Sequence, residues 1–429
     1  MFTIKKIYNN KKNKNINLYL FLFCLVILFY SSIYILSFVK VVNFWSFSQS
    51  FISYTEGFIK RGMFGTIMLF FENAFNISPR TFFASFYIFF YSLNIFLFFK
   101  LIKKYLENKL LLIFLALCPT LIMFPFNDLG GYQRLDVLSI TAILLHSLIA
   151  QKFLNFQINL NQYNKILNFL ILPFLVISIL FHEIQLISLP FHFFVTLNIN
   201  NRNFKQTIRK YSLFFIPLFL ILFIYPDDVS LKKLEEAVNN RGIWMDAYLF
   251  HTKNIGFDHY MYELKTNLLT IYNFKIHLAM VLLAVFPFYL ILYYLDKNEY
   301  LKSTNPINYF FFTISVSPFL LGLLIGDFGR WVNIMSFVAF GYLAQFPLKK
   351  SLKSFEFLSK EFSKLFLNII LISIVTFYIF FIRIPHCCNL QKNGINLYGG
   401  IMSKTIAITN VVLGNTDNKY FNLDLRFKN

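Results

Sequence analysis

Long apolar runs separated by short polar segments dominate this chain of 429 residues. A helix of roughly 17–25 mainly apolar residues crosses about 30 Å of hydrocarbon, so each run of that length predicts a transmembrane helix. We place about eleven such spans, near residues 17–39, 82–101, 109–126, 134–151, 165–182, 184–199, 211–225, 274–295, 308–326, 330–346 and 364–384. The pattern predicts an all-α, polytopic transmembrane helical bundle that forms a single integral membrane domain over residues 1–429.

Lysine and arginine gather at the N-terminus and in alternate loops, near residues 100–109, 202–210 and 349–364. Because short basic loops stay in the cytoplasm, this distribution predicts an N-terminus inside and a C-terminus outside. The outer segments are then the loops at about 40–81 and 226–273 and the tail at about 385–429. Within the first outer loop, the apolar segment 64–75 is too short to span and predicts an interfacial helix.

Composition supports this class and excludes others. Hydrophobic residues make up 57% of the chain, 59 residues are Phe and only 14% are charged, which excludes an ordinary soluble globule. The net charge of +20 follows from the basic inner loops, so no nucleic-acid partner is expected. The first apolar run exceeds the usual h-region of a cleaved signal peptide and predicts a retained anchor in the cytoplasmic (inner) membrane.

Charged residues of the first outer loop form the densest cluster, Glu56-Gly57-Phe58-Ile59-Lys60-Arg61-Gly62. Its glycines, with Gly65, allow close backbone approach or positive φ. Lys60 and Arg61 are suited to binding a phosphate, and Glu56 to accepting a proton from an acceptor hydroxyl. The alternative is that the two bases contact lipid headgroups while Glu56 pairs with one of them.

A second cluster joins the third and fourth predicted spans and contains Asp128, Arg134 and Asp136. A helix that begins near Arg134 directs its free amide groups outward, which suits a phosphate. Asp136 lies near the hydrocarbon edge, so we expect its carboxylate to have a partner within the bundle. The alternative is a helix cap at Asp128 and a headgroup contact at Arg134 and Asp136.

Two further clusters interrupt apolar runs. His182 and Glu183 lie between two runs, and an acid at that depth is by default a functional-site hypothesis, although no zinc-protease spacing accompanies it. Asp327 and Arg330 lie between two predicted spans, and Arg330 is expected either to pair with Asp327 or to contact a diphosphate. Trp331 is expected as an interfacial anchor.

The long outer loop contains His259 among aromatic and charged residues that together could cover a site. His146, inside the fourth span, is expected to be a buried, hydrogen-bonded packing residue.

The predicted chain is polytopic with its N-terminus inside, and it has an acid and an interfacial helix in its first outer loop and bases near the outer membrane edge. This layout resembles the GT-C superfamily of membrane glycosyltransferases. It is also similar to bacterial O-antigen polymerases and ligases. The resemblance implies a polyprenyl-phosphate or polyprenyl-diphosphate sugar donor, a glycan acceptor, and Glu56 in the place of the first-loop acid. Neither an adjacent acidic pair in that loop nor a WWDYG motif is present, which argues against an oligosaccharyltransferase.

The function expected from these residues is transfer of a lipid-linked sugar in cell-surface polysaccharide or glycan synthesis, with the active face outside. The catalytic candidates are Glu56, His182 and Glu183, and the substrate-binding candidates are Lys60, Arg61, Asp128, Arg134, Asp136, His259, Asp327 and Arg330. No nucleotide-binding motif and no metal-ligand spacing is present, and the sequence leaves a divalent cation open.

Two other classes stay open: a flippase or secondary transporter of a lipid-linked or anionic substrate, and a noncatalytic assembly or receptor subunit. Transport would place the ionisable groups at the midplane of the bundle, whereas here they gather near one membrane edge. The shared-site hypothesis requires one cavity lined by Glu56, Arg61, Arg134, Glu183 and Arg330.

Overall fold

The computed structural model describes residues 2–39, 44–59, 61–127, 131–200, 203–224, 227–243, 328–345 and 361–382, with isolated positions between 278 and 291 and residue 401. The elements of this part are helices, which confirms the all-α class. Helices long and apolar enough to cross a membrane lie at Ile16–Ile35, Pro79–Tyr105, Asp136–Leu154 and Leu160–Phe181. Such helices indicate an integral membrane protein. The count of eleven spans stays a prediction, and the spans predicted at 274–295 and 308–326 lie largely or wholly outside the described residues.

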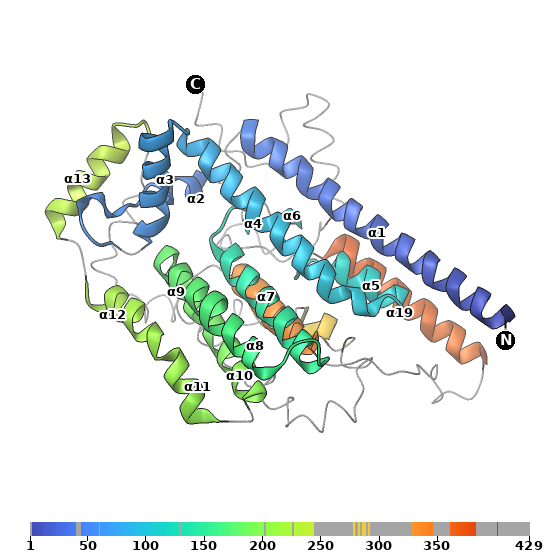
Figure 1. The fold of residues 1–429 in the computed structure, drawn as a ribbon. Coiled ribbons are helices and arrows are strands. Elements are labelled where there is room, and N and C mark those ends of the chain that lie inside the picture. Colours follow the sequence, from blue (N-terminus) through green and yellow to red (C-terminus); the bar gives the residue numbers. More distant parts are fainter. Residues whose placement is uncertain are drawn as a thin grey trace.

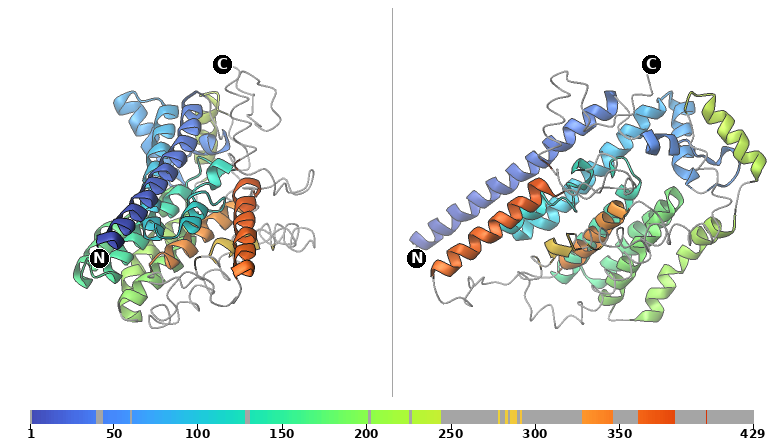
Figure 2. Two further views of the ribbon diagram at one scale, coloured as in Figure 1. Left: turned by 90° about the vertical axis from the view of Figure 1, so that its right-hand side faces the viewer. Right: turned by 180° about the vertical axis from the view of Figure 1, so that it is seen from behind.

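The centre of the bundle is α7 (Asp136–Leu154), which packs against α4 (Pro79–Ile102) and α18 (Phe328–Leu343). Helix α1 (Phe2–Val39) covers the other side of α4 (Figure 1). Behind them, α5 (Lys109–Ala116) contacts both α1 and α19 (Glu361–Phe381) (Figure 2).

Hydrogen bonds at both ends of α7 show that α7 and α18 run in the same direction and that α4 ends beside their last turns. At their first turns, Asp136 pairs with Arg330. At their last turns, the carbonyl of Ala344 accepts from Lys104 Nζ at 2.8 Å and from Gln151 Nε2 at 3.2 Å. We call the first the arginine end of the bundle and the second the lysine end.

Glycine permits the close contact between α7 and α18. A Cβ at Gly341 would lie 2.5 Å from Ser147 Oγ and 2.9 Å from Ile143 Cγ2, so a larger residue must shift these side chains of α7 or the helix itself. Small residues at such contacts let helix backbones approach, which is how helices commonly pack within membranes.

The predicted span at 109–126 is not one helix. It divides into α5 and α6 (Phe124–Asn127), joined by turns around Pro119, a residue that cannot donate the hydrogen bond a continuing helix needs. Side chains from other helices bind the carbonyls of this turn. Asn333 Nδ2 donates to the carbonyls of Thr120 at 2.8 Å and Leu121 at 3.2 Å, and Tyr30 donates to that of Ile122.

Helices lie on both sides of His182, but only the first, Leu160–Phe181, is long enough to cross a membrane; the second, Gln185–Ile199, is a shorter apolar helix. The first is a nearly continuous stretch made of α8 (Leu160–Ile166), the π-helical η4 (Leu167–Ile171) and α9 (Leu172–Phe181). His182 is extended, with φ −164° and ψ 126°, and the 3-10 helix η5 (Glu183–Ser188) and α10 (Leu189–Ile199) follow. The span predicted at 211–225 corresponds to η6 (Ser212–Phe214) and α12 (Phe215–Phe223), which directly continue α11 (Phe204–Tyr211).

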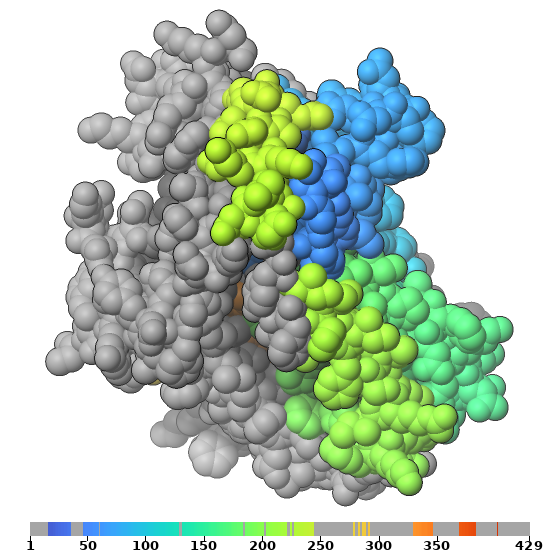
Figure 3. Space-filling model, turned by 90° about the vertical axis from the view of Figure 1, so that its left-hand side faces the viewer, coloured from blue at the N-terminus to red at the C-terminus, as the bar shows by residue number. Residues whose placement is uncertain are grey.

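At the arginine end, the first loop folds into α2 (Phe44–Gln49), η1 (Tyr54–Glu56) and α3 (Gly62–Phe75). Helix α3 confirms the helix predicted at 64–75. The amphipathic α13 (Asp228–Asn239) packs on η1, beside the blue first-loop elements in Figure 3. Just beyond α13, Arg241 pairs with Glu72 of α3 at 2.7 Å, which ties the two outer segments together.

Candidate anion-binding site

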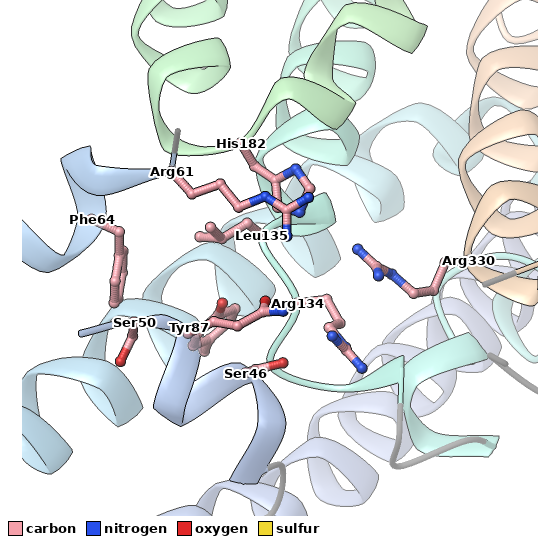
Figure 4. A pocket seen from close by; sticks show the side chains of 10 residues that line it. Ser46, Ser50, Arg61, Phe64, Tyr87, Arg134, Leu135, His182 and Arg330 are labelled. Atoms are coloured by element: carbon pink, nitrogen blue, oxygen red, sulfur yellow. The ribbon is translucent and has the colours of Figure 1, made fainter. Parts of the chain in front are cut away.

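A pocket at the arginine end collects side chains from five separate parts of the chain (Figure 4). The empty space between them is about 370 Å³, including the part that opens outward. Its described lining residues are Ser46, Gln49, Ser50, Arg61, Phe64, Tyr87, Arg134, Leu135, His182 and Arg330. The charged groups among them are all basic.

The first-loop contribution depends on an unusual backbone. Arg61 is the N-cap of α3 and has φ 67°, the left-handed region that a non-glycine residue adopts at a cost of about 1–2 kcal/mol. Gly62 lies so close to the Tyr54 ring that a Cβ there would be 2.4 Å from it. A Cβ at Gly65 would be 2.0 Å from the carbonyl oxygen of Ile52. The close approach predicted for these glycines is confirmed, and it fixes the loop from which Arg61 enters the pocket.

The second contribution comes from the turn before α7. Gln133 has φ 59°, a second left-handed residue beside a pocket arginine, and Arg134 is buried. Gln185 of η5 binds the turn, since its Nε2 donates to the carbonyl of Leu135 at 2.9 Å while its Oε1 accepts from Ser139 Oγ. Strained residues held by surrounding contacts are common at functional sites.

Arg330 reaches the pocket from the first turn of α18 and is paired. Its Nε and Nη2 donate to the two carboxylate oxygens of Asp136 at 2.6 and 2.7 Å, and the two side chains are 5% and 8% exposed. The expectation that Asp136 has a partner within the bundle is confirmed. Asp136 is a partner of Arg330 that the sequence did not suggest, and the expected contact with Asp327 or a diphosphate stays a prediction because Asp327 lies outside the described residues. Asp136 therefore holds Arg330 in place and neutralises part of the local positive charge.

The other predicted site residues divide into three groups. Glu56 lies in η1, is partly exposed and is not among the described lining residues. The backbone of Glu183 belongs to η5, but its side chain lies outside the described part. Outside the described residues altogether are Lys60, Asp128, His259 and Asp327.

Two aromatic residues beside the site are more buried than their positions suggest. Trp331, expected as an interfacial anchor, is only 4% exposed, because the first turn of α18 faces the bundle and not the lipid edge. In the first loop, burial raises the pKa of the Tyr54 phenol to about 12, so this hydroxyl stays protonated.

Sequence reasoning missed the uncharged lining residues Ser46, Gln49, Ser50 and Tyr87, and it missed Gln185, which binds the turn before α7. For Gln185 the available indication was an amide within the apolar run after Glu183, where a buried polar group needs hydrogen-bond partners. Within the described residues, no group of three or more histidine, cysteine or acidic side chains could hold a metal ion.

Comparison with protein-family models, curated proteins and solved structures finds no match to this chain. The fold and site define a helical chain with membrane-spanning segments and a basic pocket at one end. Function must therefore be argued from the chemistry of that pocket.

Proposed function

We propose that this protein is a membrane glycosyltransferase that uses a polyprenyl-phosphate or polyprenyl-diphosphate sugar in cell-surface polysaccharide or glycan synthesis. The supporting observation is that Arg61, Arg134, Arg330 and His182, from distant parts of the sequence, line one pocket. Guanidinium groups bind phosphate oxygens in pairs, and their attraction for an anion is stronger in a partly buried site than in water.

The reaction needs few groups. The bond between the sugar anomeric carbon and the phosphate oxygen breaks, the phosphate leaves with the electron pair, and the acceptor oxygen forms the new bond. Arginines stabilise the charge that grows on the departing phosphate. A base takes the acceptor hydroxyl proton, and His182, which lines the pocket, is the base we assign. Glu56 and Glu183 remain candidates for the same role.

The placement of charge supports an outer active face. Lys100, Lys104 and Lys152 lie in the last turns of α4 and α7 or directly after them, at the lysine end. The pocket lies at the opposite end. Because basic loops face the cytoplasm, this arrangement favours a pocket at the outer surface of the cytoplasmic membrane.

Transport of a lipid-linked or anionic substrate is the second candidate. It is favoured by the contact of His146 and His192 inside the bundle, since ionisable pairs within membrane helices often lie on transport pathways. A flippase would move the lipid-linked sugar across the bilayer without forming a glycosidic bond.

The test uses the full-length protein in vesicles with a polyprenyl-diphosphate sugar and an oligosaccharide acceptor. We expect a new glycosidic bond in the product, and we expect Arg61→Ala and Arg134→Ala each to lower the rate by about 10²-fold. Arg209→Ala, at an exposed position of α11, is the matched control and should retain the rate.

His182→Gln separates chemistry from binding: it should abolish transfer and leave the donor bound. Movement of the donor across the bilayer without a new bond would identify a flippase. If neither pocket-arginine variant changes transfer or movement, the proposed site is wrong.

A further inference from the structure

A row of buried polar side chains follows one face of η5 and α10. Its spacing of three or four residues keeps the row on one side of the helix. The side chains are His182, Gln185, Ser188, His192 and Thr196, each no more than 6% exposed. In a helix of a membrane bundle such a face is costly unless its groups are hydrogen-bonded, and it is usually functional.

Helix α7 presents polar side chains to this row. Ser139 donates to Gln185 near the pocket, and one ring nitrogen of His146 lies 2.9 Å from one of His192. The two imidazole rings are nearly coplanar, with an interplanar angle of 3°. We call this line of contacts between α7 and η5–α10 the polar seam.

Toward the lysine end, the polar seam continues as a chain of hydrogen bonds. His146 Nε2 lies 2.8 Å from Tyr163 Oη, which lies 3.5 Å from Thr196 Oγ1, and Thr196 Oγ1 lies 3.0 Å from Tyr211 Oη. Beside this end, Lys210 Nζ donates to Asn164 Oδ1 at 2.6 Å. The four elements α7, α8, α10 and α11 thus join one chain from the bundle centre to its lysine end.

The chemistry of the links selects what can pass along them. Imidazoles and hydroxyls each donate and accept a hydrogen bond, as proton transfer requires. The chain of contacts runs from His192 through His146 and Tyr163 to Thr196. These four side chains are fully buried and in direct contact, which leaves no space for a hydrated ion. At the centre, His192 Nε2 is buried with no hydrogen-bond partner among the described residues.

We propose that the polar seam carries protons between the lysine end of the bundle and the arginine-lined pocket. A proton that binds Tyr211 Oη displaces the hydroxyl proton of Tyr211 to Thr196, and successive transfers follow to Tyr163 and to His146 Nε2. The Nδ1 proton of His146 moves to His192, which then holds the one added proton as an imidazolium.

From His192, the next polar side chain toward the pocket is Ser188, one helical turn away. Water molecules are the relays from His192 to Ser188 and from Ser188 past the Gln185 amide to His182 in the pocket, since water accepts and donates one proton in turn. Rotation of the hydroxyls and tautomer exchange of the imidazoles then restore the starting state. This proton path does not depend on the reaction in the pocket.

The test measures proton flux into vesicles that contain the full-length protein and a trapped pH-sensitive dye. A potassium gradient with valinomycin supplies the driving potential, and the measurement is made with and without polyprenyl phosphate in the bilayer. We expect flux above that of protein-free vesicles, and a loss of about tenfold or more in Tyr163→Phe and in Thr196→Val, because neither new side chain can relay a proton.

Ser147→Ala is the matched control. Ser147 is a buried hydroxyl of α7 next to His146, but it donates to the carbonyl of Ile143 and lies outside the chain of contacts. It should retain the flux of the unaltered protein. Helix content and elution as a single species show whether each variant is folded. If one of Tyr163→Phe and Thr196→Val misfolds, the test uses the other.

Two results would overturn the proposal. One is flux no greater than that of protein-free vesicles in both bilayers. The other is unchanged flux in folded Tyr163→Phe and Thr196→Val, which would mean that the network only fixes the packing of the helices. Neither result bears on sugar transfer, so failure here is distinct from failure of the proposed function.

Discussion

Replacement of Asp136 by Asn tests the most buried charge contact of the site. The substitution keeps the shape of the side chain but removes the carboxylate that accepts two hydrogen bonds from Arg330. The guanidinium then stays within the bundle without its counter-charge. We expect a large loss of stability and not the small change typical of exposed ion pairs.

The magnitude follows from burial and geometry. Both side chains are less than a tenth exposed, and both hydrogen bonds are short. Breaking such a buried pair by removing one partner costs about 3–5 kcal/mol, whereas an exposed pair contributes about 0–1 kcal/mol. The equilibrium between folded and unfolded protein should therefore shift by a factor of roughly 10² to 5 × 10³.

The assay is denaturant unfolding of the purified protein in mixed micelles, monitored by circular dichroism. The two proteins are compared on the condition that the dependence of the unfolding free energy on denaturant concentration is unchanged. Asp228→Asn, at an exposed first-turn position of α13, is the matched control and should change stability by less than about 1 kcal/mol. Asp136→Leu combined with Arg330→Met should recover most of the loss, because no unpaired charge remains. A loss below about 1 kcal/mol in Asp136→Asn would refute the reasoning, since it would mean that water reaches the pair.

Two other predictions use the same unfolding assay. Gly341→Ala should cost about 1–3 kcal/mol, because its Cβ would meet Ser147 Oγ at 2.5 Å, and adding Ser147→Ala should recover part of that cost. Full stability of Gly341→Ala would mean that the Ser147 and Ile143 side chains move aside at little cost. Arg61→Gly should be more stable than Arg61→Ala by about 1 kcal/mol because φ is 67°, while both lose binding of polyprenyl phosphate to the same extent; equal stabilities would argue against the left-handed backbone.

The sequence predicted helices wherever an apolar run was uninterrupted. The spans expected at 82–101 and 134–151 correspond to α4 and α7, because hydrophobicity over that length has few alternatives to a membrane helix. The segment predicted at 109–126 is two short helices and not one, because hydropathy is insensitive to backbone hydrogen bonding. Pro119 was the available indication of a break.

The site was predictable only in part, for a similar reason. Local clusters identified Arg61, Arg134, His182 and Arg330, which the structure brings to one pocket. Their partners were not predictable, because the choice depends on contacts across the fold. Asp136 and Arg330 are 194 positions apart, so no local pattern joins them. The role of Glu56 as a base stays a prediction.

The divided helix at residues 117–123 has a consequence for how the chain is assembled in the membrane. The carbonyls of Thr120 and Leu121 receive their hydrogen bonds from Asn333, which is synthesised more than 200 positions later. Until α18 enters the bilayer, these groups face a solvent that offers no donors. This segment therefore stays near water, or beside another protein, during much of translation, and the arginine-lined pocket next to α18 is completed among the last parts of the molecule.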